Sequence, residues 1–153
     1  MTVVRLRDGG LWVHSPLALT PECEEQLRRL GRVAHVVLPC TSPEHWYYGP
    51  RFVQAFPECA VWTVPEILYS EKGLPGFKDV RTPAIQALKR RDRAPQSLND
   101  VPPPEWGGQF EVAVLSGGPL FTAAAFLHKP SGAPPVGPLP APLRCIYLYV
   151  AVS

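Results

Sequence analysis

The sequence has no apolar run that approaches the length of a membrane span. A transmembrane helix needs about 20 consecutive apolar residues, and none of the apolar runs in these 153 residues comes near that length. We therefore expect a protein that does not cross a membrane. Strand-like residues begin within two positions of Met1, which leaves no room for a cleaved targeting peptide. The expected location is the cytoplasm.

The chain also lacks a strong excess of charge and any close pair of cysteines. Its 15 basic and 13 acidic residues give a formal net charge of +2, which is too mild to indicate a nucleic-acid or membrane partner. The basic cluster at 89–93 has no interleaved aromatic residues, so a solvated loop is favoured over a phosphate or acidic partner. The four cysteines are widely spaced, and we expect reduced thiols.

The first 65 residues carry clear patterns of regular structure. Alternating apolar residues predict a hairpin over 2–14 with Asp8-Gly9-Gly10 at its turn. Thr20, Pro21 and Glu22 predict the start of a helix that ends before Gly31. Near-continuous apolar runs at 33–38 and 60–64, separated by a helix that starts at Gly49-Pro50, predict two buried parallel strands.

The second half of the chain is rich in proline, and its pattern is weaker. Twenty prolines, mostly after Ile67, predict much irregular backbone. Residues 84–88 suggest one or two helical turns, and 110–115 with 121–128 predict neighbouring strands. Residues 132–142 are almost wholly Gly, Ala, Pro, Val and Leu, which predicts poor order after Ser131. The apolar segment 145–152 is either an added strand or an exposed segment prone to aggregation.

The order of these elements resembles the amino-terminal part of the metallo-β-lactamase-like superfamily, in its uncharacterised branch grouped as a domain of unknown function. The resemblance is carried by RDGGLWVHSP (7–16), VVLPCTSPEHWYYGPRFVQAFPECAVWTVP (36–65) and FLHKPSG (126–132). It implies an α/β (α+β) class and a truncated αββα half-sandwich, with a mixed sheet and flanking helices. Residues 1–132 would form this incomplete domain, and 133–153 a Pro/Gly-rich tail with a short apolar C-terminal segment.

The superfamily resembles this chain in the order of its helices and strands, but it has metal ligands that this chain lacks. Its signature is Thr-His-x-His-x-Asp-His after a strand, where Thr41-Ser42-Pro43-Glu44-His45 stands here without the two leading histidines. The resemblance therefore implies a non-catalytic binding or interaction module with no metal or other cofactor. The alternative that it leaves open is a zinc-dependent hydrolase with an atypical site around Glu44, His45 and His128.

Four residues form the candidate polar site: Cys40, Glu44, His45 and His128. A metal site needs three or four converging ligands, so a His45 imidazole bonded within its own loop is the favoured interpretation. A nucleophilic Cys40 paired with His45 is conceivable, but an inert buried thiol is favoured. His128 is expected to be a surface histidine.

The missing half of the implied fold predicts one kind of partner. A chain with material for little more than one sheet leaves strand edges and apolar faces open to water. We expect marginal stability and self-association through exposed sheet edges, with no nucleic-acid or membrane partner.

Overall fold

The computed structural model of this chain describes residues 1–69, 88, 94–116, 122–131 and 149–151. Its strands are β1 (Thr2–Arg5), β2 (Leu11–His14), β3 (Val33–Leu38), β4 (Ala60–Thr63), β5 (Gln96–Ser97), β6 (Phe110–Ser116), β7 (Thr122–His128) and β8 (Tyr149–Ala151). Its helices are α1 (Pro21–Leu30), α2 (Gly49–Ala55) and α3 (Pro65–Tyr69), with short 3-10 turns η1 (Pro43–His45) and η2 (Pro104–Trp106).

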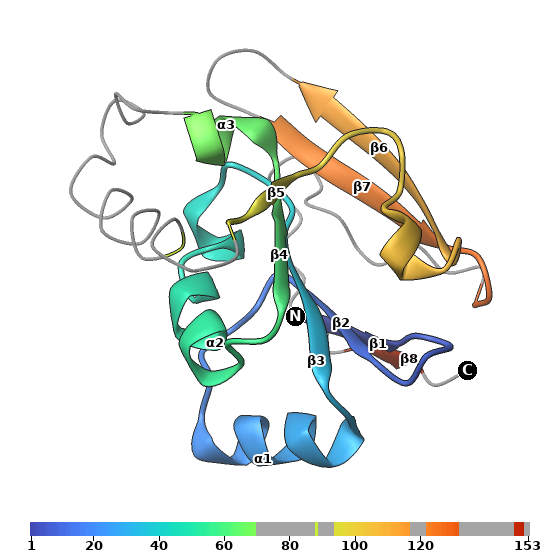
Figure 1. The fold of residues 1–153 in the computed structure, drawn as a ribbon. Helices are drawn as coiled ribbons and strands as arrows, with labels where there is room; N and C mark the ends of the chain where they lie inside the picture. Colours follow the sequence, from blue (N-terminus) through green and yellow to red (C-terminus); the bar gives the residue numbers. More distant parts are fainter. Residues whose placement is uncertain (70–87, 89–93, 117–121, 132–148, 152–153) are drawn as a thin grey trace.

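These elements form two sheets. The larger is mixed, with six strands in the order β5-β4-β3-β2-β1-β8, and the smaller is the antiparallel pair β6-β7 (Figure 1). A mixed α/β fold with flanking helices is therefore confirmed. The amino-terminal hairpin, the helix after Thr20, the two parallel strands and the later strand pair were all predicted by the sequence patterns. The short elements β5, α3, η1 and η2 were not.

The hairpin of β1 and β2 forms where the sequence places its turn residues. Gly9 has φ 83°, a left-handed conformation that glycine adopts without steric cost. The Asp8 carboxylate accepts the Gly10 N–H at 2.9 Å, which closes the turn. β2 then leads by way of α1 into β3, which lies parallel to β2. The hairpin thus places the end of β2 beside the end of β3.

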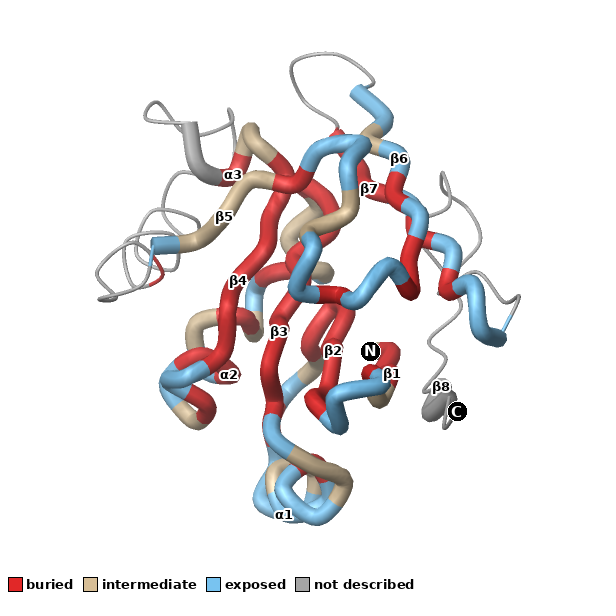
Figure 2. Tube along the Cα trace, turned by 45° about the vertical axis from the view of Figure 1, so that its right-hand side comes forward, coloured by how far each residue is buried: buried red, intermediate tan, exposed pale blue. Residues whose placement is uncertain are grey.

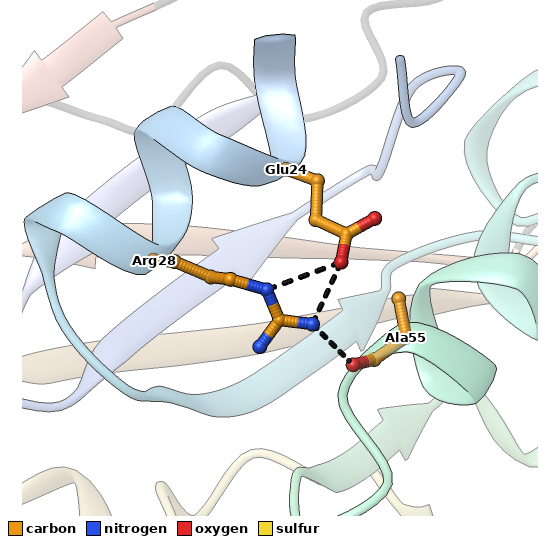
Figure 3. Close-up of polar contacts among 3 residues, drawn as sticks. All are labelled: Glu24, Arg28 and Ala55. Carbon is orange, nitrogen blue, oxygen red and sulfur yellow. Dashed lines mark hydrogen bonds and ion pairs between the residues drawn. The ribbon is translucent and has the colours of Figure 1, made fainter. Parts of the chain in front are cut away.

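Helices α1 and α2 are joined by one arginine. The Thr20 hydroxyl accepts the Cys23 N–H at 3.2 Å and caps the start of α1. From the last turn of α1, the Arg28 guanidinium donates to Glu24 at 2.7 Å and to the Ala55 carbonyl oxygen of α2 at 3.1 Å (Figure 3). The same guanidinium lies 4.9 Å from the ring centroid of Phe56. Arg28 therefore links both helices on one side of the molecule.

The α2 helix packs closely on β3 because Gly49 begins it. A Cβ atom at Gly49 would lie only 3.0 Å from a Leu38 methyl carbon, so a larger residue would require the Leu38 side chain or α2 to shift. Along the chain, β2, β3 and β4 are the most deeply buried elements, which Figure 2 shows as a continuous buried band. The predicted central, doubly covered strand at 33–38 is confirmed.

The pair β6-β7 is connected to the larger sheet at one end and by aromatic packing. Ala124 N–H donates to the Pro39 carbonyl oxygen at 2.7 Å, and Thr41 N–H donates to the Thr122 carbonyl oxygen at 3.0 Å. Trp12 of β2 faces the pair, and its ring centroid lies 4.4 Å from that of Phe110. Further ring contacts in this layer involve Trp106, Phe126, His14, His35 and Trp62.

The C-terminal strand β8 decides between the two interpretations of the apolar segment at the end of the chain. It pairs with β1 in parallel, with Thr2 opposite Tyr149, so residues 149–151 form an added strand. Of the predicted helical turns at 84–88, Leu88 alone is described, in a helical conformation and buried. Residues 84–87, the basic cluster at 89–93 and the tail from 132 to 148 lie outside the described residues. Within the described part of the chain, no helix is long and apolar enough to cross a membrane.

Candidate functional site

The candidate site lies where β2 and β3 end side by side. Open α/β sheets usually build their sites at the carboxyl ends of parallel strands. Ser15 directly follows β2, and its N–H donates to the Val37 carbonyl oxygen at 3.0 Å. The loop after β3 leads into η1, which carries Glu44 and His45. The sequence correctly predicted that this loop follows a buried strand.

His45 is hydrogen-bonded to a serine that the sequence did not single out. Its Nδ1 lies 2.9 Å from the Ser15 hydroxyl oxygen. Burial lowers the pKa of His45 below 6.5, and the nearby Glu44 carboxylate partly opposes that shift. The imidazole is therefore neutral at pH 7. The expected bond within its own loop is replaced by a bond between two loops.

Ser15 has an unusual backbone for a residue with a side chain. Its φ is 50°, the one positive φ among the described non-glycine residues. A left-handed conformation costs such a residue about 1–2 kcal/mol, and backbone strain of this kind is concentrated at functional sites. The pattern His14-Ser15-Pro16 carried no signal of this strain beyond a strand end.

His14 is packed beside this site and is fully buried. Its ring stacks on Trp12 at 5.6 Å and meets Phe126 at 5.4 Å. Burial lowers the pKa of His14 to about 3, with smaller contributions from His45 and the N-terminal ammonium group. Its Nε2 has no hydrogen-bond partner among the described residues. His14 is therefore a neutral part of the aromatic core.

The remaining polar groups of the loop have different partners. Ser42 donates its hydroxyl to the Glu44 carboxylate at 3.1 Å. The Cys40 thiol is fully buried and lies 4.0 Å from the Ser42 carbonyl oxygen. His45 Nδ1 faces Ser15 rather than this thiol. The structure thus favours the inert thiol over the Cys40–His45 pair.

His128 is buried, so the expectation of a surface histidine is wrong. It is 2% exposed, because the inward face of β7 places its ring 5.0 Å from that of Phe110. Its Nδ1 lies 2.9 Å from the Ser131 hydroxyl oxygen. Burial, and secondarily Arg7, lower the pKa of His128. Its position at a strand end beside Lys129 had predicted exposure, but the packing of β7 buries the ring.

The structure does not bring the candidate metal ligands together. β7 meets Cys40 through Ala123, whereas His128 lies five residues further along the strand, roughly 16 Å away at about 3.3 Å per residue. No group of three His, Cys, Asp or Glu side chains gathers among the described residues in a way that would hold a metal ion. Glu44 and His45 thus share the loop, and His128 stands apart.

Comparison with known proteins gives one match. Residues 1–134 match the family described as "Domain of unknown function (DUF4336)". The chain belongs to that family. Comparisons with curated proteins and with solved structures gave no match.

The family match corrects the resemblance inferred from the sequence. It is to DUF4336 alone, and no metallo-β-lactamase family matches, so membership of that superfamily and its half-sandwich fold are unsupported. The inference relied on a strand, loop, helix and strand order, which many α/β folds share. The residues that would have been specific, the leading histidines, are absent from the loop. An order of elements without ligands was too weak to identify a superfamily.

Proposed function

We propose that this DUF4336 protein is a non-catalytic binding module that self-associates through the free edge of β6. The observation that supports it is an edge strand with a largely apolar outward face. Among the described strands, β6 has β7 as its one neighbour. An unpaired strand edge is a template for pairing with another chain.

The backbone groups on the free side of β6 can be assigned. Lys129 N–H donates to the Gln109 carbonyl oxygen at 2.9 Å, so in this antiparallel register the odd-numbered residues of β6 bond to β7. The even-numbered residues then direct their N–H groups away from it. Of these, Val114 N–H donates to a carboxylate oxygen of Asp100 at 2.7 Å. Val112 N–H has no such partner among the described residues.

Most outward side chains of the pair are small or apolar, and Glu111, opposite Leu127, is the charged exception. Leu115 is 60% exposed and Leu127 is 36% exposed, and Ala113 and Ala125, which face each other across the pair, are exposed too. Exposed apolar patches often mark interaction sites. The proposed occupant is a second copy of the chain, because two β6 strands related by a two-fold axis pair antiparallel and extend one apolar face.

The polar residues support a module without catalysis. Each of the four candidates contacts a different polar group: Glu44 the Ser42 hydroxyl, Cys40 the Ser42 carbonyl oxygen, His45 the Ser15 hydroxyl and His128 the Ser131 hydroxyl. Catalysis by a metal or by an acid–base pair needs groups that converge on one reacting atom. Separate partners hold these side chains in place instead.

Sedimentation velocity over a wide range of concentration tests the association. We expect a reversible dimer, weakened at least tenfold in Leu115→Lys, which corresponds to about 1.4 kcal/mol, because each lysine places a charge on the apolar face that the pairing would extend. The matched control is Tyr47→Lys, which adds the same charge at another exposed position. Tyr47 is 51% exposed and lies outside β6 and β7. A protein that remains monomeric throughout, or an equal effect of both lysines, would refute the proposal.

Elemental analysis tests the absence of a metal role. Protein purified without added metal and then dialysed against zinc should retain less than one zinc per chain. Ester, thioester and phosphodiester substrates should show no metal-stimulated turnover. Stoichiometric zinc that is lost in His45→Ala would reverse this part of the proposal and restore the atypical site of Glu44, His45 and His128.

A further inference from the structure

Two serine–histidine pairs occur in the described structure at the same distance. Ser15 Oγ lies 2.9 Å from His45 Nδ1, and Ser131 Oγ lies 2.9 Å from His128 Nδ1. The two pairs differ in what else the hydroxyl contacts. That difference sets the direction of the proton in each pair.

In the Ser131 pair the hydroxyl has another acceptor. Its oxygen lies 3.3 Å from the carbonyl oxygen of His128, which can only accept. Ser131 therefore donates to that carbonyl group, and His128 Nδ1–H donates to the Ser131 oxygen. The His128 Nδ1 atom therefore cannot accept the hydroxyl proton of Ser131.

In the Ser15 pair the imidazole nitrogen is the acceptor. His45 Nδ1 is the one hydrogen-bond partner of the Ser15 hydroxyl among the described residues. If Nδ1–H donated instead, the hydrogen of this nearly buried hydroxyl would have no acceptor among those residues, so the arrangement in which the Ser15 O–H donates is favoured. His45 then carries its proton on Nε2. Its burial, which keeps it neutral at pH 7, leaves the Nδ1 lone pair available. A serine hydroxyl donating to a neutral imidazole is the starting arrangement for general-base activation.

The backbone around Ser15 fits the same role. Ser15 follows a strand at the carboxyl edge of the sheet with φ 50°, and a strained turn directly after a strand presents the nucleophile in α/β hydrolases. The N–H to Val37 O bond of 3.0 Å fixes this turn. Ser15 is only 8% exposed, so its hydroxyl is closed to large electrophiles.

We propose that Ser15 is an acyl-accepting serine which, with His45 as its base, takes a small acyl group from an activated ester. This goes beyond the binding module proposed above, whose interface is the edge of β6, and it gives the Ser15–His45 contact a chemical role. The Ser15 oxygen attacks the ester carbonyl carbon while its proton passes to His45 Nδ1. The carbon–oxygen bond to the leaving alkoxide then breaks, the alkoxide takes the proton from His45, and an ester at Ser15 remains.

The reaction ends at the acylated serine. Oxyanion holes commonly use the backbone N–H of the residue after the nucleophile, and that residue here is Pro16, which has none. Weak oxyanion stabilisation slows both attack on the ester and hydrolysis of the acyl-serine. The expected chemistry is therefore one slow acyl transfer per chain.

Intact mass spectrometry of the full chain with p-nitrophenyl acetate tests this inference. We expect one acetyl group per chain, located on Ser15 by peptide mapping, with one equivalent of p-nitrophenolate released. Ser15→Ala should abolish this site, and His45→Gln should slow its acetylation by about 10²-fold or more. Ser131→Ala, from the pair with the opposite proton direction, should acetylate Ser15 at the wild-type rate.

A measurement on the wild-type chain guards against variants that fail to fold. With His45 as base, the acetylation rate at Ser15 should level off above the lowered pKa of His45. A rate that continues to rise in proportion to hydroxide through neutral pH, or acetyl groups on lysines alone, would overturn the inference. Repeated turnover without metal would uphold Ser15 as nucleophile and overturn the non-catalytic proposal, so the two failures are distinguishable.

Discussion

The indole N–H of Trp62 in β4 donates to His35 Nδ1 in β3 at 3.2 Å. Both side chains are buried, and both meet the ring of Trp106, at centroid distances of 5.5 Å from Trp62 and 6.3 Å from His35. Because Nδ1 accepts, the His35 proton lies on Nε2. A polar bond thus sets the tautomer inside the aromatic layer between the larger sheet and β6-β7.

Removing that donor should cost stability. Trp62→Phe keeps an aromatic ring but takes away the indole N–H, and we expect the free energy of unfolding to fall by about 1–3 kcal/mol. Urea denaturation measures it. A double-mutant cycle with His35→Phe should give a coupling energy of about 1 kcal/mol. Strictly additive effects would show that the bond contributes nothing.

The strained backbone of Ser15 should affect stability independently of its hydroxyl group. Ser15→Ala and Ser15→Gly both remove the hydroxyl, but glycine alone tolerates φ 50° without strain. We expect the glycine variant to be more stable than the alanine variant by about 1 kcal/mol in urea denaturation. Equal stabilities would mean that the backbone relaxes at this turn and that Ser15 is not strained.

The buried His14 predicts that stability falls in acid. Burial lowers the pKa of His14 from 6.5 to about 3 in the folded chain. The unfolded chain therefore binds a proton that the folded chain does not. The contribution to stability is complete above pH 6.5 and declines towards pH 3, by up to about 1.4 kcal/mol per pH unit. His45 and His128, whose pKa values are also lowered, act in the same direction.

The comparison of wild type with His14→Phe isolates that group. Phenylalanine keeps a ring between Trp12 and Phe126 and cannot titrate. Urea denaturation at about pH 7 and about pH 5 should show a smaller loss of stability in the variant, with one proton fewer taken up on unfolding. The same pH dependence in both proteins would show that His14 is protonated in the folded chain.

The sequence predicted those parts of the fold that local patterns specify. The turn at Gly9, the cap at Thr20 and the apolar run at 33–38 each act through neighbouring residues. The two-residue strand β5 is defined by its pairing with β4, and two residues are too few to form a pattern that predicts a strand. Long-range pairing was the part that the local signals missed.

The candidate site shows the same limit. The loop with Glu44 and His45 was recognisable because it follows a buried strand. The partner of His45, Ser15, lies 30 positions earlier in the sequence, and only the parallel pairing of β2 and β3 brings the two together. His128 was assigned to the surface because it ends a strand beside Lys129, whereas the pleat of β7 directs it inward.

The link between the two helices can be tested against a built-in control. Arg28 bonds to Glu24 and to the Ala55 carbonyl oxygen, whereas the polar contact of Arg29 within the described structure is an ion pair with Glu25. We expect Arg28→Ala to lower the free energy of unfolding by about 1 kcal/mol. Arg29→Ala should change it by less than about 0.5 kcal/mol, as is usual for exposed pairs. Similar losses in thermal or urea denaturation would show that the bond to α2 is unimportant.

The last prediction concerns how the free edge of β6 is restrained. The Asp100 carboxylate accepts the Val114 N–H at 2.7 Å, so it occupies the position that a pairing strand would need. Natural edge strands commonly use charged side chains to oppose such pairing.

Asp100→Ala frees the N–H and removes a negative charge from the edge. We expect the dimer dissociation constant from sedimentation to fall about tenfold, a gain of about 1.4 kcal/mol. Asp100→Asn, whose amide oxygen can still accept the bond, is the matched control and should lie between the wild type and the alanine variant. A weaker dimer in Asp100→Ala would mean that Asp100 supports association rather than opposing it, and that the interface lies elsewhere than the edge of β6.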